Sequence, residues 1–457
     1  MQNSLKIVIY TLIVTFFLLG SDYLMTAHIS LFSIFTFFML ILYLATFFKN
    51  ARYIYLIIAI LGLFHHIFFS YFQRLLTSAD VYNFFTHVNE SFETLFALSS
   101  LFILPIGIFL VIFLGLWTLN RIKIKKYPLA KKIKYPLLLL LIFINLNSTL
   151  GLKILNKLFI LPTSTNLHVI DNETPMYPLR DENINIVLIL GESMKYDKYI
   201  EQKLKEQGHF YKKIYAGATN TDISLPLLLN MKKNTLKLQP NNQTNLFRLA
   251  KKSNFTTAFI SMQSENSLRY IKPYLQLTHV DTYKSFEKNE AEPKFDFSLL
   301  HVLEKLDFGQ KSFIVLQQIG QHSPYKFFEG KKSNDPSINY QRSVDYSFEF
   351  YKKIYTYLKQ TKKPFVLIYT SDHGEFSGEN DRYGHNSFEP IIYEVPMFIT
   401  SNSTLPINYQ QIRSHYELSQ FLVYLLGYKE KLLFDDINAT VNGTMITRED
   451  GFIIIEY

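Results

Sequence analysis

The 457-residue sequence contains no cysteine, and it shows no internal repeat and no low-complexity tract. Without cysteine, no disulfide can stabilise any domain of the chain. Disulfides are permitted rather than required outside the cytoplasm, so their absence does not argue against export. The lack of a repeat argues against a solenoid architecture.

Long apolar runs, in contrast, are plentiful in the amino-terminal third of the chain. Five stretches are roughly as long as the ~20 residues that span a bilayer, and they cover about residues 7–19, 29–48, 53–72, 95–119 and 135–155. The first is short enough for a signal peptide, but no small-residue cleavage site is clear and four further stretches follow it. We therefore expect a membrane domain of five transmembrane helices over residues 1–155, with an uncleaved first helix.

The loops between these stretches differ in charge, and this difference predicts the orientation in the membrane. Basic residues lie between the second and third stretches, at Lys49 and Arg52, and between the fourth and fifth stretches, from Arg121 to Lys134. The alternate loops carry acidic residues, namely Asp22, Asp80, Glu90 and Glu93. By the positive-inside rule the amino terminus is cytoplasmic, and five spans then place the rest of the chain on the outer face. Much of the clustered charge behind the net +9 belongs to one cytoplasmic loop, so nucleic-acid binding is not expected.

The remainder of the chain is long enough for one large domain with a sizeable core. A proline-containing linker over residues 156–182 leads into a domain over residues 183–457. In it, helix-like segments such as Ser337–Gln360 alternate with short apolar runs at 184–190, 256–261, 312–317, 365–370 and 395–400. This alternation predicts an α/β domain with a mainly parallel sheet, covered on both faces. Asn442-Gly443 and Asp450-Gly451 predict one or two hairpins at the carboxyl end.

Side chains that bind metals follow two of these runs at the point where each run ends. Glu192 follows the run 184–190, and Asp372 and His373 follow the run 365–370. Because the carboxyl ends of buried parallel strands meet at one edge of a sheet, these side chains are expected to meet. Two carboxylates and one imidazole suit zinc or manganese better than calcium. Taken singly, an acid after a strand often caps a helix and an Asp-His pair occurs by chance, but their joint placement predicts a metal-centred hydrolase or transferase.

A candidate nucleophile is Thr221, where a loop enters the helix-like run 222–230. A hydroxyl at this position can be deprotonated by metal coordination. The positive end of the helix dipole stabilises the negative charge that results. The alternative is an ordinary threonine helix cap.

These residues resemble the phosphoethanolamine transferases of the alkaline-phosphatase-like superfamily, which include the enzymes behind colistin (polymyxin) resistance. The resemblance covers nearly the whole chain, from the membrane domain through the linker to the outward α/β domain. The family's motifs fall on Glu192, on Thr221 with Ser224 and Pro226, on Ser371-Asp372-His373-Gly374-Glu375, on His385, and on Gly320-Gln321-His322-Ser323-Pro324, where two small positions are changed.

The resemblance implies one tightly held zinc ion with Glu192, Thr221, Asp372 and His373 as ligands. His322 and His385 would face the phosphoryl group or a second zinc, and Glu375 would lie with them at the substrate. Thr221 would attack phosphatidylethanolamine, release diacylglycerol and pass phosphoethanolamine to lipid A, core oligosaccharide or another periplasmic acceptor. The implied protein is a monomer of the bacterial inner membrane with a periplasmic catalytic domain.

The outer loop between the third and fourth apolar stretches carries several phenylalanines and suits a helix near residues 79–94 lying in the membrane interface. Thr86 and Glu90 lie one turn apart on it. In the resembled family, residues at this spacing contact the donor's ethanolamine; a plain solvated glutamate is the alternative. The family's asparagine one turn earlier is replaced by Tyr82.

The chain departs from the family elsewhere as well. Gly217 and Leu227 occupy the positions of a disulfide that spans the nucleophile turn, so core packing is expected to hold this turn. A lysine-containing motif is missing near residues 263–269, where Glu265 or Arg269 would have to substitute. Three alternatives remain: a phosphoglycerol transferase that uses phosphatidylglycerol, a sulfatase or phosphodiesterase acting on a soluble ester, and a catalytically inactive binding protein.

Overall fold

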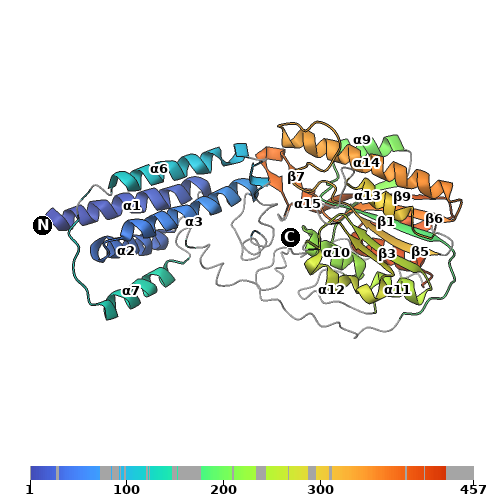
Figure 1. Cartoon of the computed structure of the whole chain (residues 1–457), viewed down its shortest axis with the longest axis horizontal. Coiled ribbons are helices and arrows are strands. Elements are labelled where there is room, and N and C mark those ends of the chain that lie inside the picture. The colour runs from blue at the N-terminus through green and yellow to red at the C-terminus, as the bar shows by residue number, and fades with distance from the viewer. Residues whose placement is uncertain are drawn as a thin grey trace. The chain divides into compact units, whose positions relative to one another are not determined.

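The computed structural model describes residues 2–26, 30–72, 84, 92, 94–96, 99–119, 122, 124–146, 152, 176–207, 210–232, 243–265, 267–286, 295–307, 311–385, 389–405 and 407–428. The chain divides into two compact units, Met1–Thr163 and Ser164–Tyr457, and each is described by itself (Figure 1). The division falls within the expected linker. The predicted carboxy-terminal hairpins lie outside the described residues.

The first unit is built of apolar helices. They are α1 (Gln2–Thr26), α2 (Leu31–Phe47), α3 (Ala51–Phe72), the short 3-10 helix η1 (Ser99–Phe102), α6 (Ile103–Leu119) and α7 (Lys131–Ile144). Within the part of the chain that the structure describes, three segments are long and apolar enough to cross a membrane: Gln2–Leu24, Ala51–Tyr71 and Ser99–Leu119. They match the first, third and fourth expected spans.

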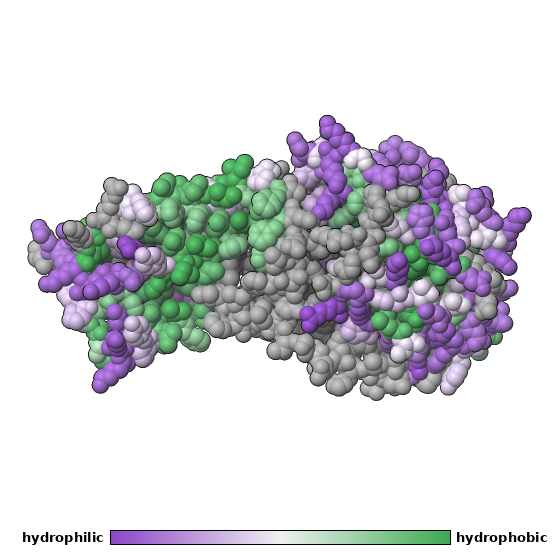
Figure 2. All heavy atoms as spheres, viewed as in Figure 1, coloured by the Kyte–Doolittle hydropathy of each residue, from purple (hydrophilic) through white to green (hydrophobic). Residues whose placement is uncertain are grey.

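The second and fifth expected spans are shorter in the structure. Helix α2 has 17 residues, and α7 has 14 and ends at Ile144, with Asn145 as its C-cap. Five membrane spans therefore remain a prediction. Hydrophobic side chains form a broad band over the middle of the first unit, with hydrophilic residues gathered at one end (green and purple in Figure 2), and such a band suits a surface that faces lipid rather than water.

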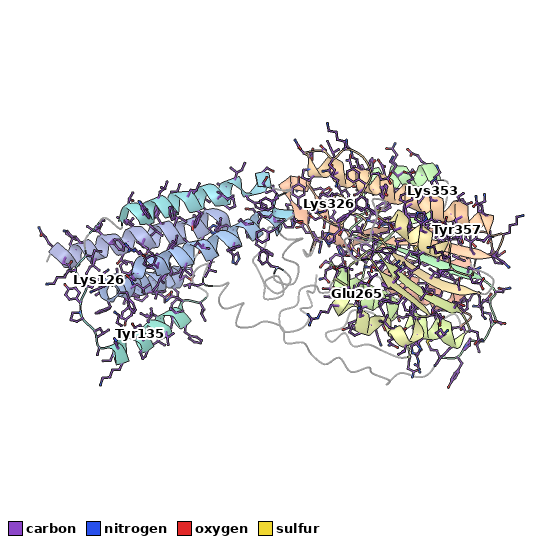
Figure 3. The ribbon with its side chains drawn as sticks, in the orientation of Figure 1. Lys126, Tyr135, Glu265, Lys326, Lys353 and Tyr357 are labelled. Atoms are coloured by element: carbon purple, nitrogen blue, oxygen red, sulfur yellow. The ribbon has the colours of Figure 1, made fainter. Side chains whose placement is uncertain are left out.

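The lysines expected in a cytoplasmic loop contact the end of a helix. Nζ of Lys126, labelled in Figure 3, donates to the carbonyl of Ala45 at 2.5 Å, and Nζ of Lys134 donates to the carbonyl of Phe47 at 2.6 Å. The last carbonyls of α2 have no partner within the helix, and a positive charge is favourable there. These contacts satisfy the carboxyl end of α2.

One acidic residue lies elsewhere than the sequence predicts. Asp22 was expected in an outer loop, but α1 continues to Thr26 and places Asp22 inside the bundle. The Asp22 carboxylate is buried, and its Oδ1 lies 3.0 Å from Nε2 of His66 in α3. The expected loop position was wrong because the helix extends beyond the apolar stretch.

The second unit contains a seven-stranded sheet in the order β2-β9-β6-β1-β5-β3-β4. The strands are β1 (Asn185–Gly191), β2 (Phe210–Tyr215), β3 (Thr256–Ser261), β4 (Thr282–Ser285), β5 (Ser312–Gln317), β6 (Phe365–Ser371) and β9 (Glu394–Ser401). Among the described strands of this sheet, β9 runs opposite to the other six, so the predicted mainly parallel sheet is confirmed. All five predicted strands are present. The two edge strands β2 and β4 were missed because they are only partly buried and lack a continuous apolar run.

Helices cover both faces of this sheet (Figure 1). Ile186, Leu188 and Leu190 of β1 pack with α10 (Thr221–Leu229), α11 (Leu246–Lys252) and α16 (His415–Leu425). The alternate residues Val187 and Ile189 pack with α9 (Lys198–Gln207), α13 (Phe297–Leu303) and α14 (Pro336–Gln360). Successive side chains of a strand point to opposite faces, so a fully apolar strand is buried on both sides.

The remaining elements are short and lie in the connections. They are η2 (Ser267–Tyr270), α12 (Lys272–Leu275), η3 (Leu277–His279), the hairpin of β7 (Phe376–Ser377) and β8 (Tyr383–Gly384), η4 (Glu379–Asp381), α15 (Pro390–Tyr393) and η5 (Ile407–Gln411). The register of the central pair is the feature that positions the site. Gly191 at the end of β1 pairs with Ser371 at the end of β6, so Glu192 and Asp372 leave the sheet side by side.

Candidate metal centre and nucleophile

Glu192, Asp372 and His373 converge at the carboxyl edge of the sheet, where all three side chains are buried. One ligand atom of each lies within 4.8 Å of the other two. Nε2 of His373 is 3.5 Å from Oε1 of Glu192 and 3.5 Å from Oδ2 of Asp372. Among the described residues, this is the group of acidic and histidine side chains that could hold a metal ion.

The hydroxyl of Thr221 completes this group. Its Oγ1 lies 2.5 Å from Oδ2 of Asp372, 3.1 Å from Oε2 of Glu192 and 3.3 Å from Nε2 of His373. Ligands at ~2.0–2.1 Å from a tetrahedral zinc ion are separated from each other by about 3.3 Å. The separations of Thr221 from Glu192 and His373, and of His373 from both carboxylates, are 3.1–3.5 Å and lie close to this value, whereas the 2.5 Å between Thr221 and Asp372 is a hydrogen bond that would lengthen around an ion.

The Asp372 carboxylate is oriented by backbone hydrogen bonds. Its Oδ1 accepts from the N–H of Ser193 at 3.0 Å and from the N–H of His373 at 2.8 Å. Its own N–H donates to the carbonyl of Gly191 at 3.0 Å, which ties the end of β6 to the end of β1. Since Oδ1 is held by two donors, Oδ2 is the oxygen that faces Thr221.

The His373 imidazole is held in one tautomer. Its Nδ1 lies 2.9 Å from the carbonyl of Gly374 and must carry the proton, which leaves the Nε2 lone pair for a ligand. Burial lowers the pKa of His373, although the Asp372 charge opposes this shift, so the imidazole is kept in the neutral form that binds metals. Glycine is needed at 374 because a Cβ there would meet the carbonyl oxygen of Ile391 at 2.2 Å.

The electrostatics of the site also favour a cation. Burial raises the pKa of the Glu192 carboxyl well above its usual range, and the neighbouring Asp372 charge raises it further. Hydrogen bonds from Oγ of Ser193 at 3.0 Å and from Oγ1 of Thr221 at 3.1 Å lower the pKa of Glu192 and offset only part of this effect. Two buried carboxylates side by side are costly unless a positive charge lies between them. The mixed oxygen and nitrogen donors fit Zn²⁺.

Thr221 is the first residue of α10, and its hydroxyl is not the helix cap. Asn220 takes the N-cap position, with extended backbone at φ −152°. The ordinary-cap alternative for Thr221 is therefore wrong. One turn on, the Ser224 hydroxyl donates to the carbonyl of Asp372, which joins α10 to the end of β6. The position of Thr221 also exposes its oxygen to the positive end of the helix.

Packing closes the nucleophile turn at the two positions where relatives were expected to carry a disulfide. A Cβ added at Gly217 would lie 3.1 Å from Cδ1 of Leu227 and 3.4 Å from its Cβ. Leu227 also packs with Ala218, Ile223 and Tyr274 in a small buried cluster. These packing contacts hold the turn closed without a disulfide, as the sequence predicts for a chain without cysteine.

Of the other residues expected at the substrate, His385 lies beside this centre. The rings of His385 and His373 have centroids 4.3 Å apart, and Nδ1 of His385 lies 2.9 Å from Oε2 of the buried Glu375. Burial raises the pKa of Glu375 to about 7, while a hydrogen bond from the Tyr325 hydroxyl lowers it. Nδ1 of His322 contacts the carbonyl of Ser323 at 2.7 Å, so its Nε2 is the nitrogen available to a ligand. Thr86 and Glu90 lie outside the described residues.

Sequence reasoning missed two buried side chains that support the site. Gln263 donates to Glu192 from the segment where a lysine motif was expected, whereas Glu265 contacts Tyr283, Ser285 and Lys272 instead (Figure 3 labels Glu265). His415, at the start of α16, contacts Ser224 at 3.3 Å, and burial lowers its pKa to about 4. No local pattern marks either residue, because their partners are distant in the sequence.

Comparison with known proteins places the chain in a family. The sequence profile of the sulfatase family matches residues 184–428, which include the whole described sheet and every residue of the metal centre. The chain belongs to the sulfatase family.

Two relatives are phosphoethanolamine transferases, the group that the motifs predicted. The phosphoethanolamine transferase EptA of Helicobacter pylori is 22% identical over 287 residues, which cover 55% of this chain and 54% of that protein. The chain thus matches about half the length of this curated relative. The solved structure of the integral membrane lipooligosaccharide phosphoethanolamine transferase A from Neisseria meningitidis has 16% identity and a TM-score of 0.61, covering 93% of this chain and 96% of that chain. This likeness shows a shared fold that includes both units.

Proposed function

We propose that this chain is a membrane-anchored, zinc-dependent transferase that moves phosphoethanolamine from phosphatidylethanolamine to a hydroxyl of a periplasmic glycolipid or glycan. The observation that carries the proposal is the position of the Thr221 hydroxyl. It lies within 3.3 Å of both carboxylates and the imidazole of the candidate metal centre, at the amino terminus of α10. A hydroxyl in this environment is an activated nucleophile.

Glu192, Asp372, His373 and Thr221 would hold the ion, which, when bound, lowers the pKa of the Thr221 hydroxyl and neutralises charge on the phosphoryl group. Oγ1 of Thr221 gives its proton to water and forms a bond to phosphorus, while the bond from phosphorus to the diacylglycerol oxygen breaks. A histidine, His322 or His385, supplies the proton that the departing diacylglycerol oxygen requires. The product of this half-reaction is phosphoethanolamine esterified to Thr221.

In the second half-reaction the histidine accepts a proton instead of donating one, and Thr221 is the leaving group instead of the nucleophile. An acceptor hydroxyl gives its proton to the same histidine and attacks phosphorus, the bond to Oγ1 of Thr221 breaks, and Oγ1 takes a proton back from water. Hydrogen-bonding groups must bind the phosphoryl oxygens as their charge develops, and the imidazoles of His322 and His385 are suited to this. Glu375 orients His385 through the 2.9 Å contact to Nδ1.

The membrane domain supports a lipid donor over a soluble one. A lipid is confined to the bilayer, and a catalytic domain attached to membrane helices meets it at a high effective concentration. The amino terminus is assigned to the cytoplasm, and the sulfatase-like unit to the periplasmic side of the inner membrane.

Intact mass spectrometry of the full-length protein tests this function. The protein and its Thr221→Ala variant are incubated in detergent with zinc and with phosphatidylethanolamine or phosphatidylglycerol. We expect one phosphoethanolamine adduct, with the first lipid only and only on the wild-type protein. A phosphoglycerol adduct would instead assign the chain to the phosphoglycerol transferases. No adduct with either lipid, combined with rapid turnover of a soluble ester, would assign a hydrolase.

A further inference from the structure

Lys195 is a buried lysine that the proposed reaction does not use. It is 1% exposed and follows the candidate ligand Glu192 by three positions. Its backbone N–H donates to the Tyr340 hydroxyl at 3.1 Å, and this hydroxyl donates to the carbonyl of Ser193 at 3.1 Å. The backbone of Lys195 is therefore fixed close to the segment that carries Glu192. A lysine is almost never fully buried unless its ammonium group is paired, so its partners indicate its role.

The ammonium group is paired with a hairpin that is distant in the sequence. Nζ of Lys195 donates to Oγ of Ser377, 182 positions later, at 2.5 Å, and to Oε1 of Glu379. Ser377 belongs to β7, which is labelled in Figure 1, and Glu379 lies in the turn that leads to β8. Burial raises the pKa of the Glu379 carboxyl, but the Lys195 charge and hydrogen bond hold it below its ordinary value. The contact is therefore an ion pair between Lys195 and the turn of the hairpin.

The same hairpin determines where two residues of the candidate site lie. Glu375 directly precedes β7, and His385 directly follows β8. Because Phe376 pairs with Gly384, the two residues meet at the open end of the hairpin, where Nδ1 of His385 is 2.9 Å from Oε2 of Glu375. The centroid of the His385 ring is 4.3 Å from that of His373. A shift of the hairpin would therefore move the His385 imidazole relative to the metal centre.

The hairpin is too small to fix its own position. Strands β7 and β8 have two residues each and form a separate two-stranded sheet. A lone hairpin is at best marginally stable, so contacts with the surrounding residues must hold it. The Ser337 hydroxyl provides one, since it donates to the carbonyl of Ser377 at 2.5 Å. Lys195 provides the contact from the segment of the metal centre, and a Cβ added at Gly374 would lie 3.1 Å from the Lys195 Cβ.

We propose that Lys195 is a positioning residue, which fixes the β7–β8 hairpin to the segment of Glu192 and thereby holds the His385 imidazole beside the metal centre. It acts through the hairpin, without contact to the reacting atoms. The inference rests on the proposed function, because it names how a histidine of that reaction is held in place. The alternative is an ion pair that only stabilises the fold. The two differ in whether the effect of Lys195 on the rate depends on His385.

A double-mutant cycle on the full-length protein with zinc tests this role. Lys195→Met removes the charge and keeps a side chain of similar length. The rate at which phosphatidylethanolamine forms the adduct on Thr221 is measured at saturating lipid, for Lys195→Met alone and in the His385→Ala and His322→Ala backgrounds. We expect a loss of about 10- to 100-fold in the wild-type and His322→Ala backgrounds. In the His385→Ala background the further loss should be less than about twofold, because residues that act through one another are not additive.

Three further variants make the cycle decisive. Lys195→Arg keeps the charge and should recover part of the rate. Lys213→Met removes a lysine whose Nζ lies 2.6 Å from Oε1 of Glu394, in a pair between β2 and β9, and should react at the wild-type rate. Glu379→Gln changes the partner of Lys195 whose side chain is 40% exposed, and the same cycle with this variant decides the question if Lys195→Met does not fold.

Equal losses in the His385→Ala and His322→Ala backgrounds would show that the ion pair only stabilises the fold, and would overturn the proposal. Backbone hydrogen exchange over residues 376–385, measured without lipid, gives a readout that is independent of the reaction. Exchange there should be faster in Lys195→Met than in Lys213→Met, and equal exchange would also overturn the proposal. If the wild type forms no adduct, the proposed transfer fails, while the exchange still shows whether Lys195 holds the hairpin. An adduct on the wild type together with equal losses would refute only the role of Lys195.

Discussion

The hydroxyl oxygen of Thr221 lies 2.5 Å from Oδ2 of Asp372, although 151 positions separate the two residues in the chain. The contact joins the amino terminus of α10 to the carboxyl end of β6. It exists because Oδ1 of Asp372 is occupied by two backbone donors, Ser193 and His373, which turn Oδ2 toward the helix. The proposed nucleophile and the candidate metal centre are therefore joined directly.

Thr221→Ala is expected to abolish transfer while the protein still folds and binds zinc. The substitution removes the nucleophile but only one of four proposed ligands. Zinc content by elemental analysis and the melting temperature should stay close to wild type, while turnover of phosphatidylethanolamine falls to background. Thr221→Ser, which restores a hydroxyl, should recover part of the activity. Substantial turnover by Thr221→Ala would exclude the covalent mechanism.

Glu192→Ala and His373→Ala are each expected to lose the metal. Each removes a protein ligand from a site that has three besides Thr221. Zinc per protein should fall well below one equivalent in both variants after dialysis. His301→Ala is the matched control, because this histidine lies on α13 and is partly exposed to solvent. Unchanged zinc stoichiometry in both site variants would refute the ligand assignment.

Gln263→Ala is expected to weaken zinc binding about 10- to 100-fold, the usual cost of losing a partner that orients a ligand. The amide donates to Oε2 of Glu192 at 3.1 Å and is itself buried. Competition with a chelator measures the change in affinity. Gln202→Ala, on the exposed face of α9, provides the comparison. Equal affinities in the two variants would show that Glu192 needs no such support.

A disulfide is expected to form in the double variant Gly217→Cys, Leu227→Cys. The two Cβ atoms would be 3.4 Å apart, close to the ~3.5–4.5 Å found in disulfides. Closing so short a loop should stabilise the fold by about 2–3 kcal/mol. The natural chain has no cysteine, so non-reducing mass analysis identifies the bond without ambiguity. Free thiols in the oxidised double variant, or a melting temperature unaffected by reduction, would contradict the expected geometry.

Asp296 is expected to make the stability of the second unit depend on pH. Burial raises its pKa to about 7, even though the N–H groups of Ile319 and Gly320 and the amide of Gln318 donate to it. The folded state then keeps a proton that the unfolded chain releases near its ordinary value of 3.8. The stabilisation is complete below that value and is lost as the pH rises toward 7, by about 4 kcal/mol at most.

Thermal unfolding of the full-length protein between pH 4 and pH 8 checks this dependence. Asp296→Asn should flatten the decline in melting temperature, because an amide does not titrate. Asp181→Asn, at an exposed carboxylate, should leave the decline in place. If the two variants have parallel pH profiles, Asp296 is not the group responsible.

The sequence by itself determined the two-part organisation, the central strands and the residues at their ends. Strands such as β1 and β6 are apolar throughout because they are buried on both faces, so their limits can be recognised without a structure. The polar residues that follow these strands can be recognised because each of them ends an apolar run. Glu192, Asp372 and His373 were therefore identifiable as a group before their separations were known.

Only the tertiary structure decided which other side chains reach the site and which residues pair elsewhere in the fold. The edge strands β2 and β4, the amide of Gln263, the imidazole of His415 and the buried pair of Asp22 and His66 carry no periodic or local signal. Their roles arise from contacts between elements that are distant in sequence, such as the 44 positions between Asp22 and His66. A residue's local pattern reports which face of its own helix or strand is buried. What that face meets is decided only when the elements pack together.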